Sequence, residues 1–244
     1  MDTYQITKLI ENLHQEKYPD AEVIFLAGSV MRDEATSTSD LDLVVVYSKL
    51  PNAFRDSYLY GGWPVEAFVH DPETLKYFFS EFDAPSGYPS LASMVSEGVE
   101  IPSASTFSLA LKEMAGKSLK AGPTPWASKD IESARYAISD LIEDIRDPRN
   151  VHELHATASQ LYSALANFYF RSKGLWSAKG KTIPRRLKKV DDEFATKFLS
   201  AFDTAYRDGS PDGIVSLATD LLENHGGFLF EGYRVDAPPE WRER

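Results

Sequence analysis

The first half of the chain alternates between amphipathic stretches and short apolar runs. The opening residues place Ile6, Leu9, Ile10 and Leu13 on one face of a predicted helix. Strands are predicted where β-type residues cluster between turn residues, at 22–27, 41–47, 63–70 and 99–102. Helices are predicted after the capping pair Asp71-Pro72 and at residues 88–98 and 105–120.

The second half has a different pattern, in which the helical spacing of apolar residues dominates. It begins after Ala121-Gly122-Pro123-Thr124-Pro125, the segment most typical of a linker. Helices are predicted at residues 129–146, 151–173, 183–207 and 211–225. The sequence thus predicts an α+β fold of two domains, with a small mixed sheet flanked by helices in residues 1–122 and a helical bundle in residues 123–244.

The charge balance is acidic, with 37 Asp and Glu against 26 Lys and Arg and a formal net charge of −11. Proteins that bind nucleic acid along its backbone are usually basic, so we do not expect a nucleic-acid partner. The balance is compatible with a cationic small substrate, and equally with no charged partner at all. The chain has no cysteine, which excludes disulfides and thiolate metal sites.

The apolar runs are too short to span a bilayer, which takes about 20 residues. The first residues also lack the basic and apolar regions of a signal peptide. We therefore expect a cytoplasmic protein without a membrane partner. No pattern in the sequence indicates the oligomeric state.

One segment, AGSVMRDEATSTSDLDLVVVY, combines residues that suit phosphate chemistry. In it, Gly28-Ser29 is followed after ten residues by Asp40-Leu41-Asp42, at the start of an apolar strand. Side chains alternate along a strand, so Asp40 and Asp42 share a face about 7 Å apart, where carboxylates can hold Mg²⁺. Gly28 allows a tight turn close to a ligand, and Ser29 can open a helix whose N–H groups bind phosphate.

A third carboxylate, Glu66, lies in the middle of the strand predicted at 63–70. If that strand pairs with the strand at 41–47, Glu66 faces the same pocket as Asp40 and Asp42. Phosphoryl-type transfer needs metal ions to neutralise charge and a base to take the proton of the acceptor hydroxyl. Glu66 is therefore a candidate for the general base or for a third metal ligand. Alternatively, it is a solvent-facing residue on a half-exposed strand.

Over residues 21–75 the sequence resembles the polymerase-beta-like nucleotidyltransferase superfamily, whose signature is Gly-Ser followed by Asp-x-Asp on a strand. The segment PVEAFVHD is similar to the strand of the third carboxylate in the small bacterial branch that includes the streptomycin- and spectinomycin-type aminoglycoside nucleotidyltransferases. The resemblance implies a catalytic domain at residues 1–122, two Mg²⁺ ions and ATP as co-substrate. It also implies transfer of AMP to a hydroxyl of a small acceptor, release of pyrophosphate, and Glu66 as the base. One departure is Asp33, where related sequences often carry glycine.

A basic segment, FYFRSKGLWSAKGKTIPRRLKKVD, stands out in the otherwise acidic chain. It resembles a region of the helical domain in these enzymes where a lysine faces the triphosphate, and Lys179 and Lys181 are the candidates. A solvated basic helix face is the alternative. Trp176 can stack on a base or a sugar, or it can pack at the domain junction.

Other patterns support alternative hypotheses. Arg149 and His155, like Arg146 and His152, show the Arg-x5-His spacing of HEPN-type ribonuclease toxins, although we expect these histidines to be solvated or to line a junction. Two other functions stay open: a nucleotidyltransferase that modifies a protein or RNA, as in toxin–antitoxin pairs, and a catalytically silent nucleotide-binding protein. The acidic charge disfavours RNA as the target, and the complete set of carboxylates disfavours the silent protein.

Overall fold

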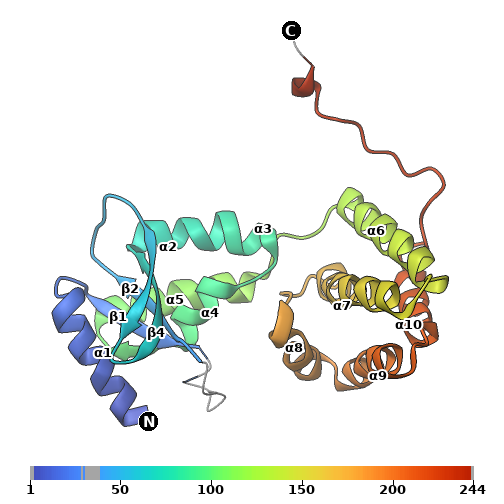
Figure 1. Ribbon diagram of the computed structural model, residues 1–244. Coiled ribbons are helices and arrows are strands. Elements are labelled where there is room, and N and C mark those ends of the chain that lie inside the picture. Colours follow the sequence, from blue (N-terminus) through green and yellow to red (C-terminus); the bar gives the residue numbers. More distant parts are fainter. Residues whose placement is uncertain (1–2, 29, 31–38, 243–244) are drawn as a thin grey trace. The chain divides into compact units, whose positions relative to one another are not determined.

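The computed structural model describes residues 3–28, 30 and 39–242 (Figure 1). The chain divides into two compact units, Met1–Thr124 and Pro125–Arg244, which we call the N-terminal and C-terminal units. Each unit is built around apolar core residues of its own.

The described residues of the N-terminal unit form a mixed five-stranded sheet flanked by helices. In chain order its elements are α1 (Thr3–Lys17), β1 (Val23–Ala27), β2 (Leu41–Val46), β3 (Phe54–Tyr60), β4 (Trp63–His70), α2 (Pro72–Phe78), the π-helix η2 (Phe79–Asp83), α3 (Ala84–Ser86), α4 (Ser90–Glu97), β5 (Val99–Ile101) and α5 (Thr106–Ala121). The strands lie in the order β3-β4-β2-β1-β5, with β2 and β4 parallel and the other neighbours antiparallel. The predicted α+β class is confirmed.

The two faces of the sheet are covered by different helices, as Figure 1 shows. On one face, α1 packs Ile6, Ile10 and Leu13 against buried residues of the strands. On the other face, α2, α4 and α5 cover apolar residues that include Phe25 of β1 and Val44 of β2. Because side chains alternate along a strand, one apolar run such as β2 contributes to both cores.

The start of α2 is determined by its N-cap, Asp71, and its first residue, Pro72. The Asp71 carboxylate accepts a hydrogen bond from the backbone N–H of Thr74 (Oδ1···N 2.8 Å). Pro72 takes the first helical position, where its missing N–H costs no hydrogen bond. The capping pair predicted from the sequence is confirmed.

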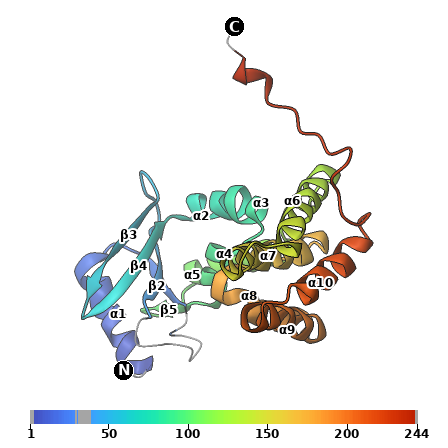
Figure 2. The ribbon, with the colours of Figure 1, turned by 45° about the vertical axis from the view of Figure 1, so that its right-hand side comes forward.

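The sequence pattern does not predict β3, which forms one edge of the sheet beside β4 (Figure 2). On one side of β3, Asp56 and Tyr60 bind side chains of α1, and on the other side Arg55 and Ser57 are exposed. The first side also carries Phe54 and Tyr58, but Asp56 interrupts these aromatic residues, so the period-two hydrophobic signal is weak. The Gly61-Gly62 turn is the feature that indicates this strand, because a two-residue turn before one strand commonly joins it to another.

The C-terminal unit is helical, and its described residues contain no strand. In chain order its elements are α6 (Ser128–Arg146), α7 (Val151–Ser172), the 3-10 helix η3 (Gly180–Thr182), α8 (Ile183–Val190), α9 (Asp192–Asp208), α10 (Asp212–Glu223) and the 3-10 helix η4 (Pro239–Trp241). Its core is rich in aromatic rings, among which Phe168, Phe170, Phe198 and Phe202 are at most 1% exposed. Across the described parts of both units, every helix is too short or too polar to cross a membrane.

The stretch predicted as one helix at residues 183–207 is two helices, α8 and α9, so this prediction is wrong at one position. Asp191 separates them in an extended conformation (φ −160°, ψ 95°). Its carboxylate accepts hydrogen bonds from the backbone N–H of Phe194 (2.9 Å) and from the Tyr169 hydroxyl (2.8 Å). Asp191 is therefore the N-cap of α9, a position that favours aspartate over most residues.

Candidate active site

The register between β2 and β4 brings three predicted carboxylates together. In this parallel pair Asp42 lies opposite Glu66, and Asp40 comes two residues before Asp42 in the chain. One carboxylate oxygen from each of the three lies within 4.8 Å of the others. The pairing that the sequence left conditional is therefore present. The chemical roles of the three residues, which we call the acidic cluster, stay predictions.

The strand face that carries the acidic cluster changes character along its length. Asp42 is half-buried at the second position of β2, and Glu66 is half-buried in the middle of β4. Further along β2 on the same face, Val44 and Val46 are fully buried in the core that α2, α4 and α5 share. The helices thus cover the later residues and leave the carboxylates in contact with solvent. Partial exposure matters because like charges repel, and solvent or a cation can screen them.

The donor set suits a hard divalent cation. All three groups are carboxylates, which are typical ligands of Mg²⁺ and Mn²⁺. Mg²⁺ holds its ligands at about 2.1 Å, so oxygens on opposite sides of one ion are about 4.2 Å apart. Separations of up to 4.8 Å need only small side-chain rotations to meet that requirement. The residues therefore fit the metal that the sequence resemblance implies.

Position 28 requires glycine because its backbone lies close to the Asp42 carboxylate. Its φ of +83° lies in the region that favours glycine. A Cβ built on Gly28 would lie 2.3 Å from Asp42 Oδ2, so any larger residue would push the carboxylate away. Ser29, the second candidate for phosphate binding, lies outside the described residues, as does Asp33.

The structure adds Arg55, which the sequence pattern does not single out. Its Nη2 lies 2.5 Å from Glu66 Oε1, and its Cζ lies 5.0 Å from the centre of the Phe68 ring. The ion pair and the cation–π contact hold the guanidinium over the exposed side of β3 and β4. Sequence spacing could not reveal this contact, because it depends on the β3–β4 register.

The candidates for triphosphate binding belong to the C-terminal unit. Lys179 directly precedes η3 and Lys181 lies within it, and both side chains are exposed. Trp176 is 7% exposed, and its carbonyl oxygen accepts a hydrogen bond from Arg186 Nε (3.4 Å). Burial of the indole favours packing over stacking on a ligand.

The residues with Arg-x5-His spacing make contacts typical of a helix surface. Arg146 forms an ion pair with Glu143, which lies one turn earlier in α6. His155 packs edge-on against Tyr206, with 5.4 Å between the ring centres, and His152 is exposed at the start of α7. These contacts are typical of packed or solvent-exposed side chains rather than of a ribonuclease centre.

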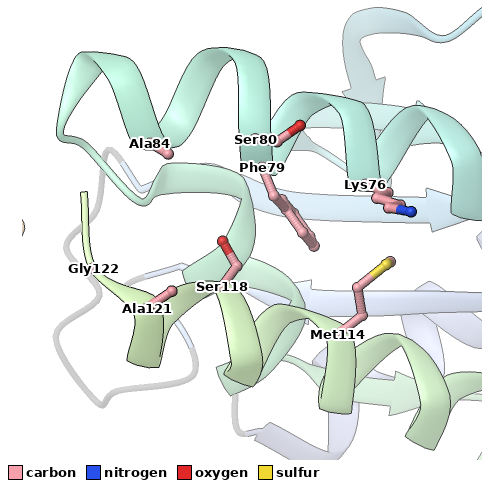
Figure 3. Close-up of a pocket in the computed structure, with 8 residues that line it drawn as sticks. All are labelled: Lys76, Phe79, Ser80, Ala84, Met114, Ser118, Ala121 and Gly122. Atoms are coloured by element: carbon pink, nitrogen blue, oxygen red, sulfur yellow. The ribbon is translucent and has the colours of Figure 1, made fainter. Parts of the chain in front are cut away.

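A cavity elsewhere in the N-terminal unit is separate from the acidic cluster. It measures about 320 Å³ and lies between the α2–η2–α3 segment and α5 (Figure 3). Phe79 and Met114 point into it from opposite helices, and Lys76 is the charged side chain in its lining. The lining includes no member of the acidic cluster, so we do not assign metal chemistry to it.

Asp83 is a carboxylate in a different environment. It is 3% exposed and accepts a hydrogen bond from the backbone N–H of Ala92 in α4 (Oδ2···N 3.0 Å). Burial raises the pKa of Asp83 to about 6, although hydrogen bonds from the first turn of α4 oppose that shift. This carboxylate joins η2 to α4 and serves the fold rather than the acidic cluster.

Comparison with known proteins identifies the segment that carries the acidic cluster. Residues 6–82 match the model of a family described as nucleotidyltransferase domain. Similar solved structures include a nucleotidyltransferase-like protein from Exiguobacterium sibiricum 255-15, with 14% sequence identity, a TM-score of 0.44, and coverage of 90% of this chain and 73% of that chain. No curated protein matches the sequence. The matched segment includes Asp40, Asp42 and Glu66, and the match identifies the protein as an enzyme of the transferase class.

Proposed function

We propose that the protein transfers a nucleoside monophosphate, AMP from ATP, to a hydroxyl of a small acceptor such as an aminoglycoside-like antibiotic, and releases pyrophosphate. One observation carries the proposal. The β2–β4 register gathers three carboxylates, two at the start of β2 and one in the middle of β4, within the segment that matches the nucleotidyltransferase family. Such a cluster of hard oxygen donors suits metal-assisted phosphoryl chemistry.

Each carboxylate has its own task in the proposed reaction. Asp40 and Asp42 hold two Mg²⁺ ions, and Glu66 takes the proton of the acceptor hydroxyl. The acceptor oxygen forms a bond to the α-phosphorus while the bond from that phosphorus to the bridging oxygen breaks, so pyrophosphate leaves with the electron pair. When bound, the Mg²⁺ ions supply positive charge that neutralises the developing charge on the phosphate oxygens.

Other residues orient the nucleotide in this proposal. Gly28 has no side chain that would displace Asp42, and its backbone can approach phosphate oxygens closely. Ser29 offers its hydroxyl and backbone N–H to the same phosphates. Lys179 and Lys181 act as counter-charges for the triphosphate, a role that their exposure and the basic character of their segment support.

The test is transfer of label from ATP labelled on its α-phosphate. Purified protein is incubated with Mg²⁺ and screened against aminoglycosides, lincosamides and cell extract. We expect label in an acceptor and an equal amount of pyrophosphate, both dependent on divalent cation and absent from Asp42→Asn. Label in a protein or RNA of the extract would identify the alternative target. ATP binding without pyrophosphate release would identify a silent nucleotide-binding protein.

The role of the basic segment has a separate test in Lys181→Ala. Losing a charged partner of the triphosphate is expected to raise KM for ATP about tenfold, with KM for the acceptor little changed. Lys189→Ala is the matched control, because Lys189 is also an exposed lysine of this basic segment. If only the KM for the acceptor changes in Lys181→Ala, the segment does not bind the nucleotide.

A further inference from the structure

The ion pair between Arg55 and Glu66 lies where a cation is expected to bind. Glu66 Oε1 meets the guanidinium at 2.5 Å, and a ligand oxygen of Glu66 lies within 4.8 Å of those of Asp40 and Asp42. The Arg55 side chain is 55% exposed and that of Glu66 is 32% exposed. Ion pairs this exposed contribute little to folding stability. The feature that sets this pair apart is therefore its position beside Asp40 and Asp42, not a contribution to stability.

The strand register shows how the guanidinium is held. Ser57 lies directly opposite Glu66, and Arg55 lies opposite Phe68, so the arginine reaches diagonally from the edge strand to the carboxylate. Its Cζ lies 5.0 Å from the centre of the Phe68 ring. This second contact does not involve the carboxylate. The guanidinium can therefore stay on the same face after it releases Glu66.

We propose that Arg55 is a positioning residue that stands in for the metal. It holds Glu66 beside Asp40 and Asp42 in the metal-free protein. When a divalent cation binds at the two aspartates, it releases that carboxylate, which is then free to act as the base. The inference rests on the proposed function, since it takes the acidic cluster to be a metal centre. The guanidinium and the cation are both positively charged and lie beside the same carboxylates, so each weakens the binding of the other by the same factor.

The exchange has a consequence for the order of events at the site. Three carboxylates this close repel one another, and Arg55 supplies one compensating charge before metal arrives. Glu66 is thereby kept near the aspartates and does not swing into solvent. The cost is a weaker affinity for free metal, which the negatively charged triphosphate offsets when metal and nucleotide enter together.

The test is Mn²⁺ binding, measured by electron paramagnetic resonance of the free ion in nucleotide-free buffer at low ionic strength. Arg55→Gln is expected to bind Mn²⁺ about fivefold more tightly than the wild type, because the competing charge is gone. Arg55→Lys keeps the charge and should stay within about twofold of the wild type. Lys17→Gln is the matched control. Its ion pair with Asp56 also reaches β3, from the opposite face of the sheet, so it should leave Mn²⁺ affinity unchanged.

A second measurement follows Arg55 itself. Modification of arginines with phenylglyoxal, mapped by peptide mass spectrometry, should be faster at Arg55 when Mn²⁺ is saturating, because the guanidinium is no longer paired. Arg207, which pairs with Asp208 on the surface of α9, is the internal control and should react at one rate throughout. An unchanged or slower rate at Arg55 with Mn²⁺ bound would overturn the exchange.

The outcomes separate this inference from the proposed function. If the wild type and all variants fail to bind Mn²⁺, the metal centre fails and the proposed function fails with it. If the wild type binds Mn²⁺ but Arg55→Gln binds it no more tightly, the metal centre stands and the role of Arg55 is wrong. Equal tightening in Lys17→Gln would likewise overturn it, since the effect would then reflect overall charge.

Discussion

The two faces of the central sheet differ in how far their apolar residues extend. On the face that packs against α1, β2 is apolar throughout, with Leu41, Leu43 and Val45 fully buried. On the opposite face, Asp40 and Asp42 precede the first buried valine. Neighbouring positions of one strand therefore serve different purposes. On the α1 face, the whole strand contributes to stability. On the opposite face, the first positions carry the carboxylates of the acidic cluster instead of apolar side chains.

Asp42→Asn should affect the function of the face that carries the acidic cluster without destabilising the sheet. Losing a metal ligand is expected to lower the transfer rate by about 10³-fold or more. The melting temperature in metal-free buffer should be unchanged or slightly higher, because one of three repelling charges is gone. Transfer of labelled AMP and thermal unfolding by circular dichroism measure the two effects. Near-normal turnover would remove Asp42 from the metal centre.

The neighbouring substitution Leu43→Ala is the matched contrast. Leu43 is fully buried, so its truncation should cost about 2–5 kcal/mol of unfolding free energy. Turnover per folded molecule should stay close to the wild-type value at temperatures where the variant is folded. If both variants lost stability, or both lost turnover without unfolding, the two faces would not be functionally distinct.

Glu66→Gln separates two roles within the acidic cluster. As a general base, Glu66 matters only when the proton is transferred, so its loss should lower the single-turnover rate by about 10²–10⁴-fold with Mg²⁺·ATP binding intact. Glutamine keeps the size of the side chain but cannot take the proton. Calorimetric titration of Mg²⁺·ATP provides the second measurement. Lost binding would make Glu66 a metal ligand, and unchanged kinetics would make it a strand residue facing water.

Much of this fold is encoded in local patterns, which is why the sequence predicts it. The strand expected at residues 63–70 is β4 (Trp63–His70), and the capped helix after it begins at Pro72. Both features depend on side chains adjacent in sequence. Strand β3 escapes prediction because Asp56 interrupts the aromatic residues of one side and the other side is exposed. The break at Asp191 escapes because helical periodicity continues through it.

The site shows the same limit. The alternation of a strand puts Asp40 and Asp42 on one face, and this follows from the sequence. The place of Glu66 depends on which strands pair, so the sequence could state it only as a condition. The contact of Arg55 with Glu66 needs in addition the register of an unpredicted edge strand. A contact is therefore harder to predict from sequence spacing when it depends on more pairings between distant strands.

Gly28→Ala disturbs the acidic cluster from its border and is expected to have a smaller effect. The new Cβ would meet Asp42 Oδ2 at 2.3 Å, and a φ of +83° is unfavourable for alanine. We expect about 1–3 kcal/mol of lost stability and roughly tenfold weaker Mn²⁺ binding, because the carboxylate must move. Urea unfolding and Mn²⁺ titration measure the two losses.

Gly62→Ala is a control that has the backbone strain of Gly28→Ala but not the contact with Asp42. Gly62 has a similar φ of +85°, but a Cβ there has no neighbouring atom within 4 Å. This variant should lose stability through strain while its Mn²⁺ affinity equals that of the wild type. If Gly62→Ala weakened Mn²⁺ binding as much as Gly28→Ala, the contact between Gly28 and Asp42 would not be what shapes the acidic cluster.

Two carboxylates outside the acidic cluster should make stability depend on pH. Their substitution is not expected to affect transfer. Asp83 and Asp71 are 3% and 5% exposed. Burial raises the pKa of Asp83 to about 6. Burial acts in the same direction on Asp71, but hydrogen bonds from the backbone N–H groups of Thr74 and Leu50 outweigh it and hold the pKa of Asp71 below its usual value. The two residues should therefore change the pH dependence of stability in opposite directions.

For Asp83, the folded protein binds the proton more tightly than the unfolded chain, whose pKa is 3.8. Its contribution to stability is present below about pH 4 and is lost as the pH rises through about 6. Asp83→Asn cannot ionise, so its unfolding free energy relative to the wild type should rise between about pH 4 and pH 7.5, by at most about 3 kcal/mol. Asp71→Asn should show the reverse, with a wild-type advantage at neutral pH that shrinks as the pH falls below about 4. Urea unfolding at several pH values measures both differences, and a flat difference for Asp83→Asn would mean that its buried carboxylate ionises without cost to the fold.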